Sequence, residues 1–277
     1  MSVVAQLREG RAHEGTPSGR ASDRAFLGVS ALVFAASAVA TIVGCASMSH
    51  MGMRMPGGWT MSMAWMRMPE QTWFDAAAAF LGMWTVMMVA MMLPSLVPML
   101  SRYRRAVGRA VEARLGARTA VVGAGYFFVW SLIGAALFPL GVALAELEMQ
   151  QAPVARAVPL AVGVVVLVAG AVQLSSWKAR HLVCCREGPA GVGALPADAG
   201  TAWRHGLRLG LHCARCCANL MTICVVVGVM DLGAMALVTA AMALERLAPA
   251  GERVARAIGV VVVGVGAVLI ARAFGLG

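Results

Sequence analysis

The chain has 277 residues, of which 60% are hydrophobic and 13% charged, and its formal net charge is +10. This hydrophobic share exceeds what a soluble globular domain of this length carries, so we expect one bundle of helices in a lipid bilayer. The arginines sit in short segments between apolar runs and not on a soluble basic face. The positive charge therefore reports membrane orientation and does not predict a nucleic-acid partner.

Six apolar runs are long enough to cross about 30 Å of hydrocarbon as helices. They are Phe26–Ala46, Ala76–Leu100, Thr119–Ala145, Val154–Leu174, Ala218–Leu244 and Val254–Phe274. We predict an all-α, polytopic membrane helix bundle of six spans across residues 26–274, preceded by a cytoplasmic tail of residues 1–25. The first run is expected to be retained, because its polar flank is long for a signal peptide and no convincing cleavage site follows it.

Two connecting segments are strongly basic and set the expected orientation. Ser101–Arg118 holds six arginines against one glutamate, and Ser175–Cys217 is also rich in Lys and Arg. The positive-inside rule predicts that both segments are cytoplasmic. With an even number of spans, both the N and C termini are expected in the cytoplasm, and the loop of residues 47–75 is expected outside.

The external loop 47–75 is the first place where metal-ligand chemistry concentrates. Its soft donors are Met48, His50, Met51, Met53, Met55, Met61, Met63, Met66 and Met68. Thioethers suit Cu(I) in an oxidising compartment, where thiolates would be lost as disulfides. The close spacing of His50, Met51, Met53 and Met55 lets one loop turn several donors onto one ion. The alternative is an interfacial loop whose Met and Trp side chains lie against lipid headgroups.

The second place is the sequence GLHCARCCANLM, where His212 precedes Cys213, Cys216 and Cys217. Spacings of three and four residues put these thiols on one face of a helix. In a reducing cytoplasm they are expected to be free thiols, which favours a metal-binding or redox role. The alternative is that the cysteines pack between membrane helices.

The same helical face continues along the expected fifth span. It would carry Met221, Cys224, Asp231, Met235 and Met242, so that S and O ligands line the depth of the span. Asp231 is the one carboxylate well inside an apolar run, which makes it a candidate for accepting a proton or binding a cation. Its alternative role is a hydrogen bond that locks neighbouring helices together.

A third cluster follows the fourth span and supplies His181, Cys184 and Cys185. It is expected to face the same compartment as the Cys213 group, and four-coordinate sites of thiolates and imidazoles combine ligands in this way. Neither segment has the paired spacing of a zinc ribbon, so zinc stays possible beside copper. The methionines of the second span, Met83 to Met92, are expected mainly to pack.

The ordered motifs also resemble a family of bacterial integral membrane proteins that is described as metal-binding and as a domain of unknown function. The resemblance runs from about Gly82 to Pro249. Its pieces are W-x-x-M-x-x-A-M-M-x-P-S from Trp84 to Ser95, Tyr126 with Trp130, Gln173, Lys178, Cys185 with Arg186, G-L-x-C-x-x-C-C from Gly210 to Cys217, and Glu245 with its basic neighbour. The resemblance implies a bound metal but no particular activity. His181 replaces a usual cysteine, and Ala218 replaces a usual tryptophan.

Together these features predict a copper-handling protein of the bacterial inner membrane that binds, delivers or transports Cu(I). A membrane or periplasmic metalloprotein is the expected partner. Two other classes stay open, which are a metal-containing subunit of a membrane redox enzyme and an accessory or structural membrane subunit. Motifs for nucleotide binding, zinc proteolysis and haem attachment are absent, which argues against ATP-driven pumping by this chain and favours a protein that is not itself an enzyme.

Overall fold

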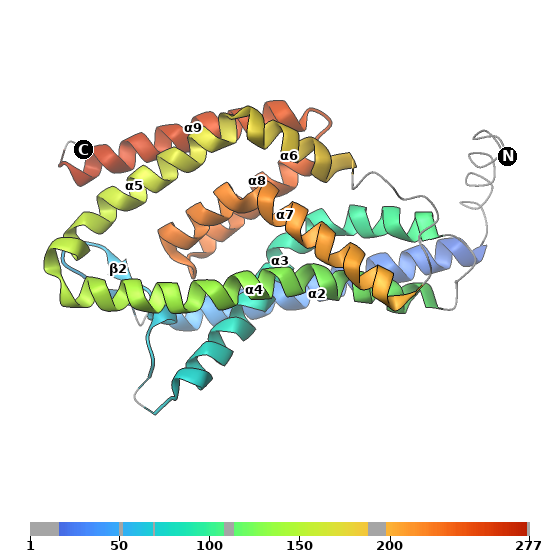
Figure 1. Ribbon diagram of the computed structural model, residues 1–277, viewed down its shortest axis with the longest axis horizontal. Helices are drawn as coiled ribbons and strands as arrows, with labels where there is room; N and C mark the ends of the chain where they lie inside the picture. Colours follow the sequence, from blue (N-terminus) through green and yellow to red (C-terminus); the bar gives the residue numbers. More distant parts are fainter. Residues whose placement is uncertain (1–16, 50–51, 69, 108–113, 188–197, 276–277) are drawn as a thin grey trace.

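The computed structural model describes residues 17–49, 52–68, 70–107, 114–187 and 198–275. Over these ranges the chain is almost entirely helical, which confirms the predicted all-α class (Figure 1). The helices are α2 (Pro17–Ser49), α3 (Trp73–Val107), α4 (Leu115–Gln150), α5 (Ala152–Leu174), α6 (Ser176–Glu187), α7 (Ala199–Gly228), α8 (Leu232–Leu247) and α9 (Gly251–Ala273). A hairpin of two short strands, β1 (Met53–Arg54) and β2 (Thr60–Met61), and a 3-10 turn (Met63–Trp65) join α2 to α3.

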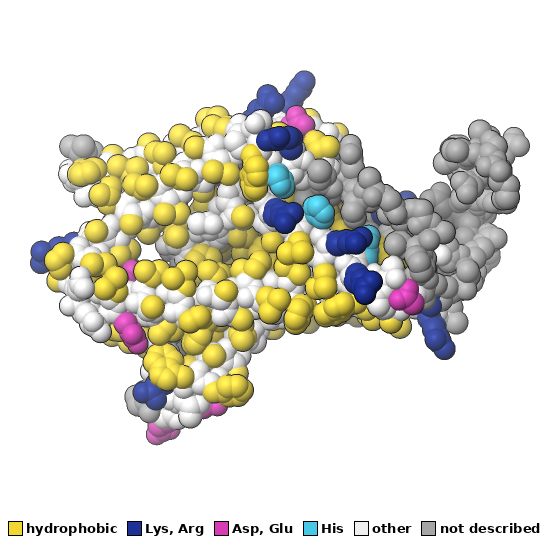
Figure 2. Space-filling model, in the orientation of Figure 1, with side chains coloured by type: hydrophobic (Ala, Val, Ile, Leu, Met, Phe, Trp, Pro, Cys, Tyr) yellow, Lys and Arg dark blue, Asp and Glu magenta, His cyan; other side chains and the backbone are white. Residues whose placement is uncertain are grey.

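Six of these helices are long and apolar enough to cross a membrane, which confirms the predicted number. They are α2, α3, α4, α5, α7 and α9. Their outer faces are hydrophobic, and large side chains such as Leu32 and Phe74 are more than two-thirds exposed. Figure 2 shows hydrophobic side chains over much of the visible face, while Lys, Arg and His side chains gather over α6 and α7. Such a surface suits a lipid bilayer with a polar boundary at one end.

Small residues allow the long helices to pack closely. A Cβ atom on Gly206 of α7 would lie only 3.1 Å from the Cα of Gly125 in α4. A Cβ atom on Gly170 of α5 would lie 2.7 Å from the backbone nitrogen of Val263 in α9. Glycine is favoured at such crossings because van der Waals packing drives association between membrane helices.

The structure corrects the expected fifth span, Ala218–Leu244. The helix α7 begins at Ala199 and ends at Gly228, whose φ of +149° favours glycine. After this turn Asp231 caps the start of α8, because its carboxylate accepts a hydrogen bond from the backbone N–H of Ala234 at 2.7 Å. The apolar run is therefore two helices joined by a turn. Residues 199–217 belong to α7 and not to a loop 175–217.

This turn also changes the expected position of the chain ends. The helix α8 runs back along α7, and α9 then packs antiparallel to α5, since Gly163 lies by Ile270 and Gly170 lies by Val263. In Figure 1 the described N-terminal end of α2 and the C-terminal end of α9 lie at opposite ends of the long axis. Hydropathy merged α8 with α7, so the even-span argument counted as one pass a stretch that the structure divides into two helices.

The Met-rich hairpin packs against the end of the bundle where α4 meets α5. Trp59 donates a hydrogen bond from Nε1 to the carbonyl oxygen of Ala155 at 2.9 Å. Met55 and Met61 are buried in a small hydrophobic cluster with Ala145 and Ala155. The hairpin is thus held to the helices by one hydrogen bond and by apolar contacts. Two of its methionines, Met55 and Met61, take part in these apolar contacts.

Candidate metal centre

Two cysteines one helical turn apart in α7 share a single arginine of α8. The Sγ atoms of Cys213 and Cys217 accept hydrogen bonds from Nη2 of Arg246 at 3.0 Å and 2.9 Å. Each of these cysteines is only 1% exposed, and Arg246 is also buried. Side chains four residues apart project from the same helical face, so the shared donor holds both sulfurs around one point. Cys213 and Cys217 are called the thiol pair below.

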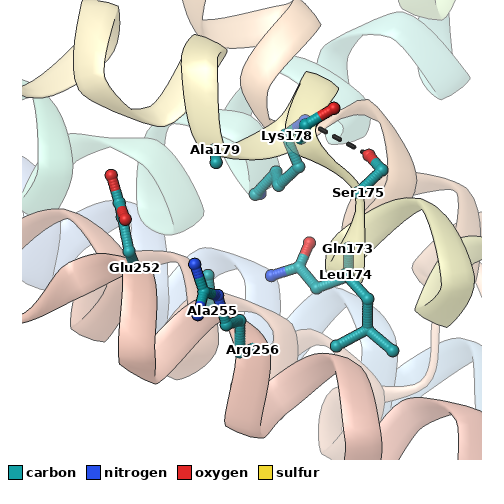
Figure 3. Close-up of a pocket in the computed structure, with 9 residues that line it drawn as sticks. Gln173, Leu174, Ser175, Lys178, Ala179, Glu252, Ala255 and Arg256 are labelled. Carbon is teal, nitrogen blue, oxygen red and sulfur yellow. Dashed lines mark hydrogen bonds between the residues drawn. The ribbon is translucent and has the colours of Figure 1, made fainter.

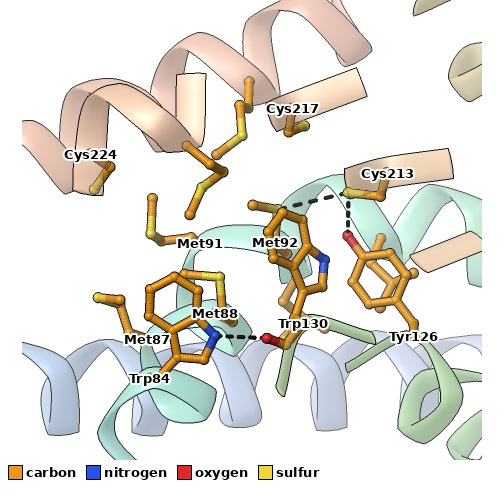
Figure 4. Packing of buried hydrophobic residues seen from close by; sticks show 14 of the residues in the cluster. Trp84, Met87, Met88, Met91, Met92, Tyr126, Trp130, Cys213, Cys217 and Cys224 are labelled. Carbon is orange, nitrogen blue, oxygen red and sulfur yellow. Dashed lines mark hydrogen bonds between the residues drawn. The ribbon is translucent and has the colours of Figure 1, made fainter. Parts of the chain in front are cut away.

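Helices α3 and α4 complete the surroundings of the thiol pair. The hydroxyl of Tyr126 donates a hydrogen bond to Cys213 Sγ at 2.8 Å, and Cys213 Sγ lies 4.0 Å from Met92 Sδ. Figure 4 shows Met92 and Tyr126 directed toward Cys213. Two thiols and one thioether therefore approach a common volume, and these soft donors suit Cu(I).

A buried polar network fixes the helices around the cysteine-bearing turn. Lys178 Nζ of α6 lies 2.9 Å from Glu245 Oε2 of α8 and donates to the carbonyl oxygen of Cys216 at 2.8 Å. The Gln173 side chain of α5 donates to Glu245 and accepts from Asn219 of α7. Lys178 and Glu245 are at most 1% exposed. The network satisfies each of its charges internally, as a buried ion pair must.

Arg246 differs from Lys178 because no carboxylate of the described residues pairs with it. The neighbouring Glu245 is engaged by Lys178. The Nε and Nη1 atoms of Arg246 are buried and have no hydrogen-bond partner within the described ranges, so its contacts run through Nη2 to the thiol pair. A guanidinium stays charged and is costly to bury without a negative partner. The nearest groups that can become negative are the thiols of the thiol pair, whose thiolate form is the one that binds metals.

A cavity of about 260 Å³ opens beside the polar network. It is lined by Gln173 and Lys178 together with Glu252 and Arg256 of α9. Figure 3 shows the two α9 side chains across from Lys178 and Gln173. The cavity has room for water next to the ion pair, so this side of the network is a polar pocket in an otherwise apolar bundle.

The predicted His181 cluster lies on α6, where His181 packs against Trp177 of the same helix. The Nδ1 atom of His181 lies 2.8 Å from the carbonyl oxygen of Trp177, and the two rings pack 4.2 Å apart. Cys184 and Cys185 belong to α6, but their side chains lie outside the described atoms. His212 is partly exposed. Among the described residues no three His, Cys, Asp or Glu side chains form a metal-binding group, and the predicted site that combines the His181 and Cys213 clusters stays a prediction.

The deeper ligands predicted along one span fall into two different environments. Met221 and Cys224 are buried in the main hydrophobic cluster, at 5% and 2% exposure. Asp231 is exposed at the turn between α7 and α8 and caps α8. Asp231 therefore lies at a turn between two helices and not within one continuous helix, because the chain leaves α7 at Gly228, and its predicted role in proton or cation binding stays a prediction.

The predicted ligands of the Met-rich loop are also separated. His50 and Met51 lie outside the described residues. Met53 is exposed on β1, whereas Met55 is buried beneath the hairpin. The hydrophobic contacts of Met55 favour a packing role for that residue. Copper binding by this loop stays a prediction.

Sequence reasoning did not single out Arg246, Tyr126 or Met92 as site residues. Each lies in a motif that carries the family resemblance, as the basic neighbour of Glu245, the Tyr of the Tyr–Trp pair and the second Met of A-M-M. Their approach to Cys213 joins positions 33 to 121 residues apart in the chain. Such contacts follow from tertiary packing and have no local spacing signal.

The fold and the site define a protein with six membrane-length helices and a buried sulfur centre held by an arginine. Residues 81–269 match a family model, PpoB2, that is described as a copper chaperone. Because the match covers more than half of the 277 residues, the chain belongs to the PpoB2 copper chaperone family. No curated protein and no solved structure matches the chain. The matched segment contains the thiol pair, Met92, Tyr126 and Arg246, whereas α2 and the Met-rich hairpin precede it.

Proposed function

We propose that the protein is a multi-pass protein of the bacterial inner membrane that holds Cu(I) as cargo at the thiol pair and passes it to another protein. The observation that supports this most is the single guanidinium nitrogen of Arg246 bound to both thiols. The copper chaperone family assignment agrees with it.

The charge of the site favours a monovalent cation. Two thiolates and one Cu(I) carry one net negative charge, and the buried guanidinium of Arg246 neutralises it. A divalent ion such as zinc would leave one net positive charge in an apolar core, where uncompensated charge is expensive. The thioether of Met92 adds a soft neutral donor, which leaves this charge balance unchanged.

The same arginine also favours release of the ion. When the cargo leaves and one proton from solvent takes its place on a sulfur, the sulfurs keep the N–H donors of Arg246 and the hydroxyl of Tyr126 as partners. Buried polar groups that lose one partner and keep another avoid most of the cost of an unmade hydrogen bond. A chaperone needs such a site, because it must give up its metal.

We infer that exchange with a membrane or periplasmic metalloprotein occurs at the end of the bundle that carries the Met-rich hairpin. Met53 and Met68 are exposed there, at 41% and 37%, and present soft donors to a partner. Buried Met55 and Met61 would hold the hairpin in place.

The test is Cu(I) titration of the purified full-length protein in detergent, in competition with a chromophoric chelator. Replacing both members of the thiol pair, Cys213→Ser with Cys217→Ser, is expected to remove the tightest-bound Cu(I). Cys216→Ser is the control, since it changes a thiol on the same turn that is not one of the two sulfurs bound by Arg246. Size-exclusion elution checks folding. Wild-type affinity in the double variant would overturn the proposal.

A further inference from the structure

A second group of sulfur atoms lies where α2 meets the turn between α7 and α8. The thiol of Cys45 lies 3.8 Å from Sδ of Met230 and is 1% exposed. Cys224 of α7 is 2% exposed and lies with Cys45 in the main hydrophobic cluster. The two thiols and the thioether come from three segments, α2, α7 and the turn. The contact between Cys45 and Met230 joins two of these segments through sulfur atoms, which are soft donors.

A fourth sulfur atom lies at the same level of the bundle. A Cβ atom on Gly44 would be 3.1 Å from Sδ of Met83, so this α3 side chain lies against α2 next to Cys45. The two thiols lie in the main hydrophobic cluster, and the partly buried Met230 packs against it. Packing alone explains a buried sulfur, but it does not require two thiols and two thioethers from four segments to meet.

Methionines of α3 belong to the same hydrophobic cluster as Cys224 and the thiol pair. Met88 and Met91 are buried, at 0% and 4% exposure. Figure 4 shows Met91 and Met92 between Cys224 and Cys213, with Met88 beside them. Thioethers are neutral, so an ion moves from one thioether to the next without exchange of a proton, whereas the thiolate that it leaves takes up a proton again.

The two groups of thiols differ in their charge surroundings. The thiol pair has a cationic partner, Arg246. The charged group that acts on Cys224 is instead an anion, the carboxylate of Asp231. With no cationic partner, the second group keeps its charge unchanged when one thiol proton leaves to solvent and one Cu(I) takes its place. It should therefore use one thiolate and bind more weakly than the thiol pair.

We propose that Cys45, Cys224 and Met230 form an entry site for a soft monovalent cation, which then passes along the α3 methionines to the thiol pair. This inference rests on the proposed function of the thiol pair and adds the route and order of binding. Cys45 precedes residues 81–269, so this site is not contained in the segment that matches the copper chaperone family.

The experiment counts copper per chain in the full-length protein in detergent, after loading from a Cu(I)–chelator complex. The entry-site variant combines Cys45→Ser with Cys224→Ser. It is expected to fall from about two ions per chain to about one and to keep the wild-type affinity for that ion. The thiol-pair variant is expected to keep about one ion, bound at least roughly tenfold more weakly.

Met230→Leu provides a variant that keeps both thiols and the apolar bulk. It is expected to weaken the second ion and leave the tight one unchanged, whereas Met149→Leu, on an exposed α4 side chain, should change neither. Two ions with wild-type affinities in both the entry-site variant and Met230→Leu would overturn the entry site. An unchanged tight ion in the thiol-pair variant would instead overturn the proposed function, so the two failures are distinguishable.

Discussion

The guanidinium of Arg246 meets the thiol of Cys217 at 2.9 Å in the interior of the helix bundle. This contact exists because the chain turns after Gly228, so that the end of α8 returns to the level of the α7 cysteines. The adjacent Glu245 is paired with Lys178, which leaves the arginine to the sulfurs. Of these two neighbouring residues of α8, Glu245 therefore pairs with a lysine of α6, whereas Arg246 contacts the thiols.

Replacing Arg246 by methionine should weaken Cu(I) binding at the thiol pair by at least roughly tenfold. Without the guanidinium, the complex of one Cu(I) and two thiolates keeps a net negative charge in an apolar interior. Arg246→Lys keeps the charge and should recover part of the affinity, although an ammonium lacks the planar donor geometry. Chelator competition measures both affinities.

The matched control for this prediction is Arg180→Met, which removes an exposed arginine of α6. It lowers the net charge of the protein by the same amount, so it separates local compensation from the general field. Equal affinities for Arg246→Met and the wild type would show that the arginine has no role in holding the ion.

The buried ion pair between Lys178 and Glu245 should stabilise the fold as long as both charged partners are present. Glu245→Gln leaves a buried ammonium without its carboxylate and should lower the free energy of unfolding by about 3–5 kcal/mol. The double variant Lys178→Met with Glu245→Gln removes the unpaired charge and should be less destabilised than the single one. Thermal unfolding in detergent compares them, with the exposed Glu252→Gln as control. A double variant as unstable as the single would contradict this account.

Most of the fold was predictable from the sequence because long apolar runs are a direct signal of membrane-length helices. Five of the six predicted spans lie within single helices to within a residue, and α9 ends one residue before Phe274. The run Ala218–Leu244 failed because hydropathy averages over Gly228 and Asp231, while a helix end depends on backbone conformation and capping. The first half of α7 was missed because its arginines dilute the hydropathy.

The candidate site was predictable only in part. Spacing placed Cys213, Cys216 and Cys217 on one face of a helix, and all three are buried. Nothing in local spacing could assign Arg246 to these thiols, because α8 must first turn back along α7. Asp231 was placed inside a membrane span because the expected span ran past Gly228. In the structure it lies at the turn and caps α8.

The arrangement of the helices predicts that the two ends of the protein lie on opposite sides of the membrane. A reporter fused after Ala273 should behave like one inserted at Gly58 and opposite to one fused after Val107, because α8 adds a return pass before α9. Paired alkaline phosphatase and fluorescent fusions give this readout. If the fusion after Ala273 matches the one after Val107, then α8 and α9 do not sit as described.

Variants of the methionines in and beside the Met-rich hairpin can distinguish a role in capturing copper from a role in packing. Met53 and Met68 are exposed, whereas Met55 and Met61 are buried against the ends of α4 and α5. Changing the exposed pair to leucine removes soft donors but keeps bulk, so transfer of Cu(I) from a chelator to the thiol pair should slow several-fold. The final affinity should not change, because the thiol pair is intact.

Changing the buried pair, Met55 and Met61, to leucine is the matched comparison. Both hydrophobic volumes are nearly conserved, so the cost in stability should stay below about 1.5 kcal/mol for each change. The transfer rate should remain at the wild-type value, since these two sulfurs are already covered by the hairpin contacts. Stopped-flow absorbance of the chelator measures both double variants under one condition. Equal transfer rates for the exposed and buried pairs would mean that the hairpin is a membrane-surface element, and that copper reaches the thiol pair without it.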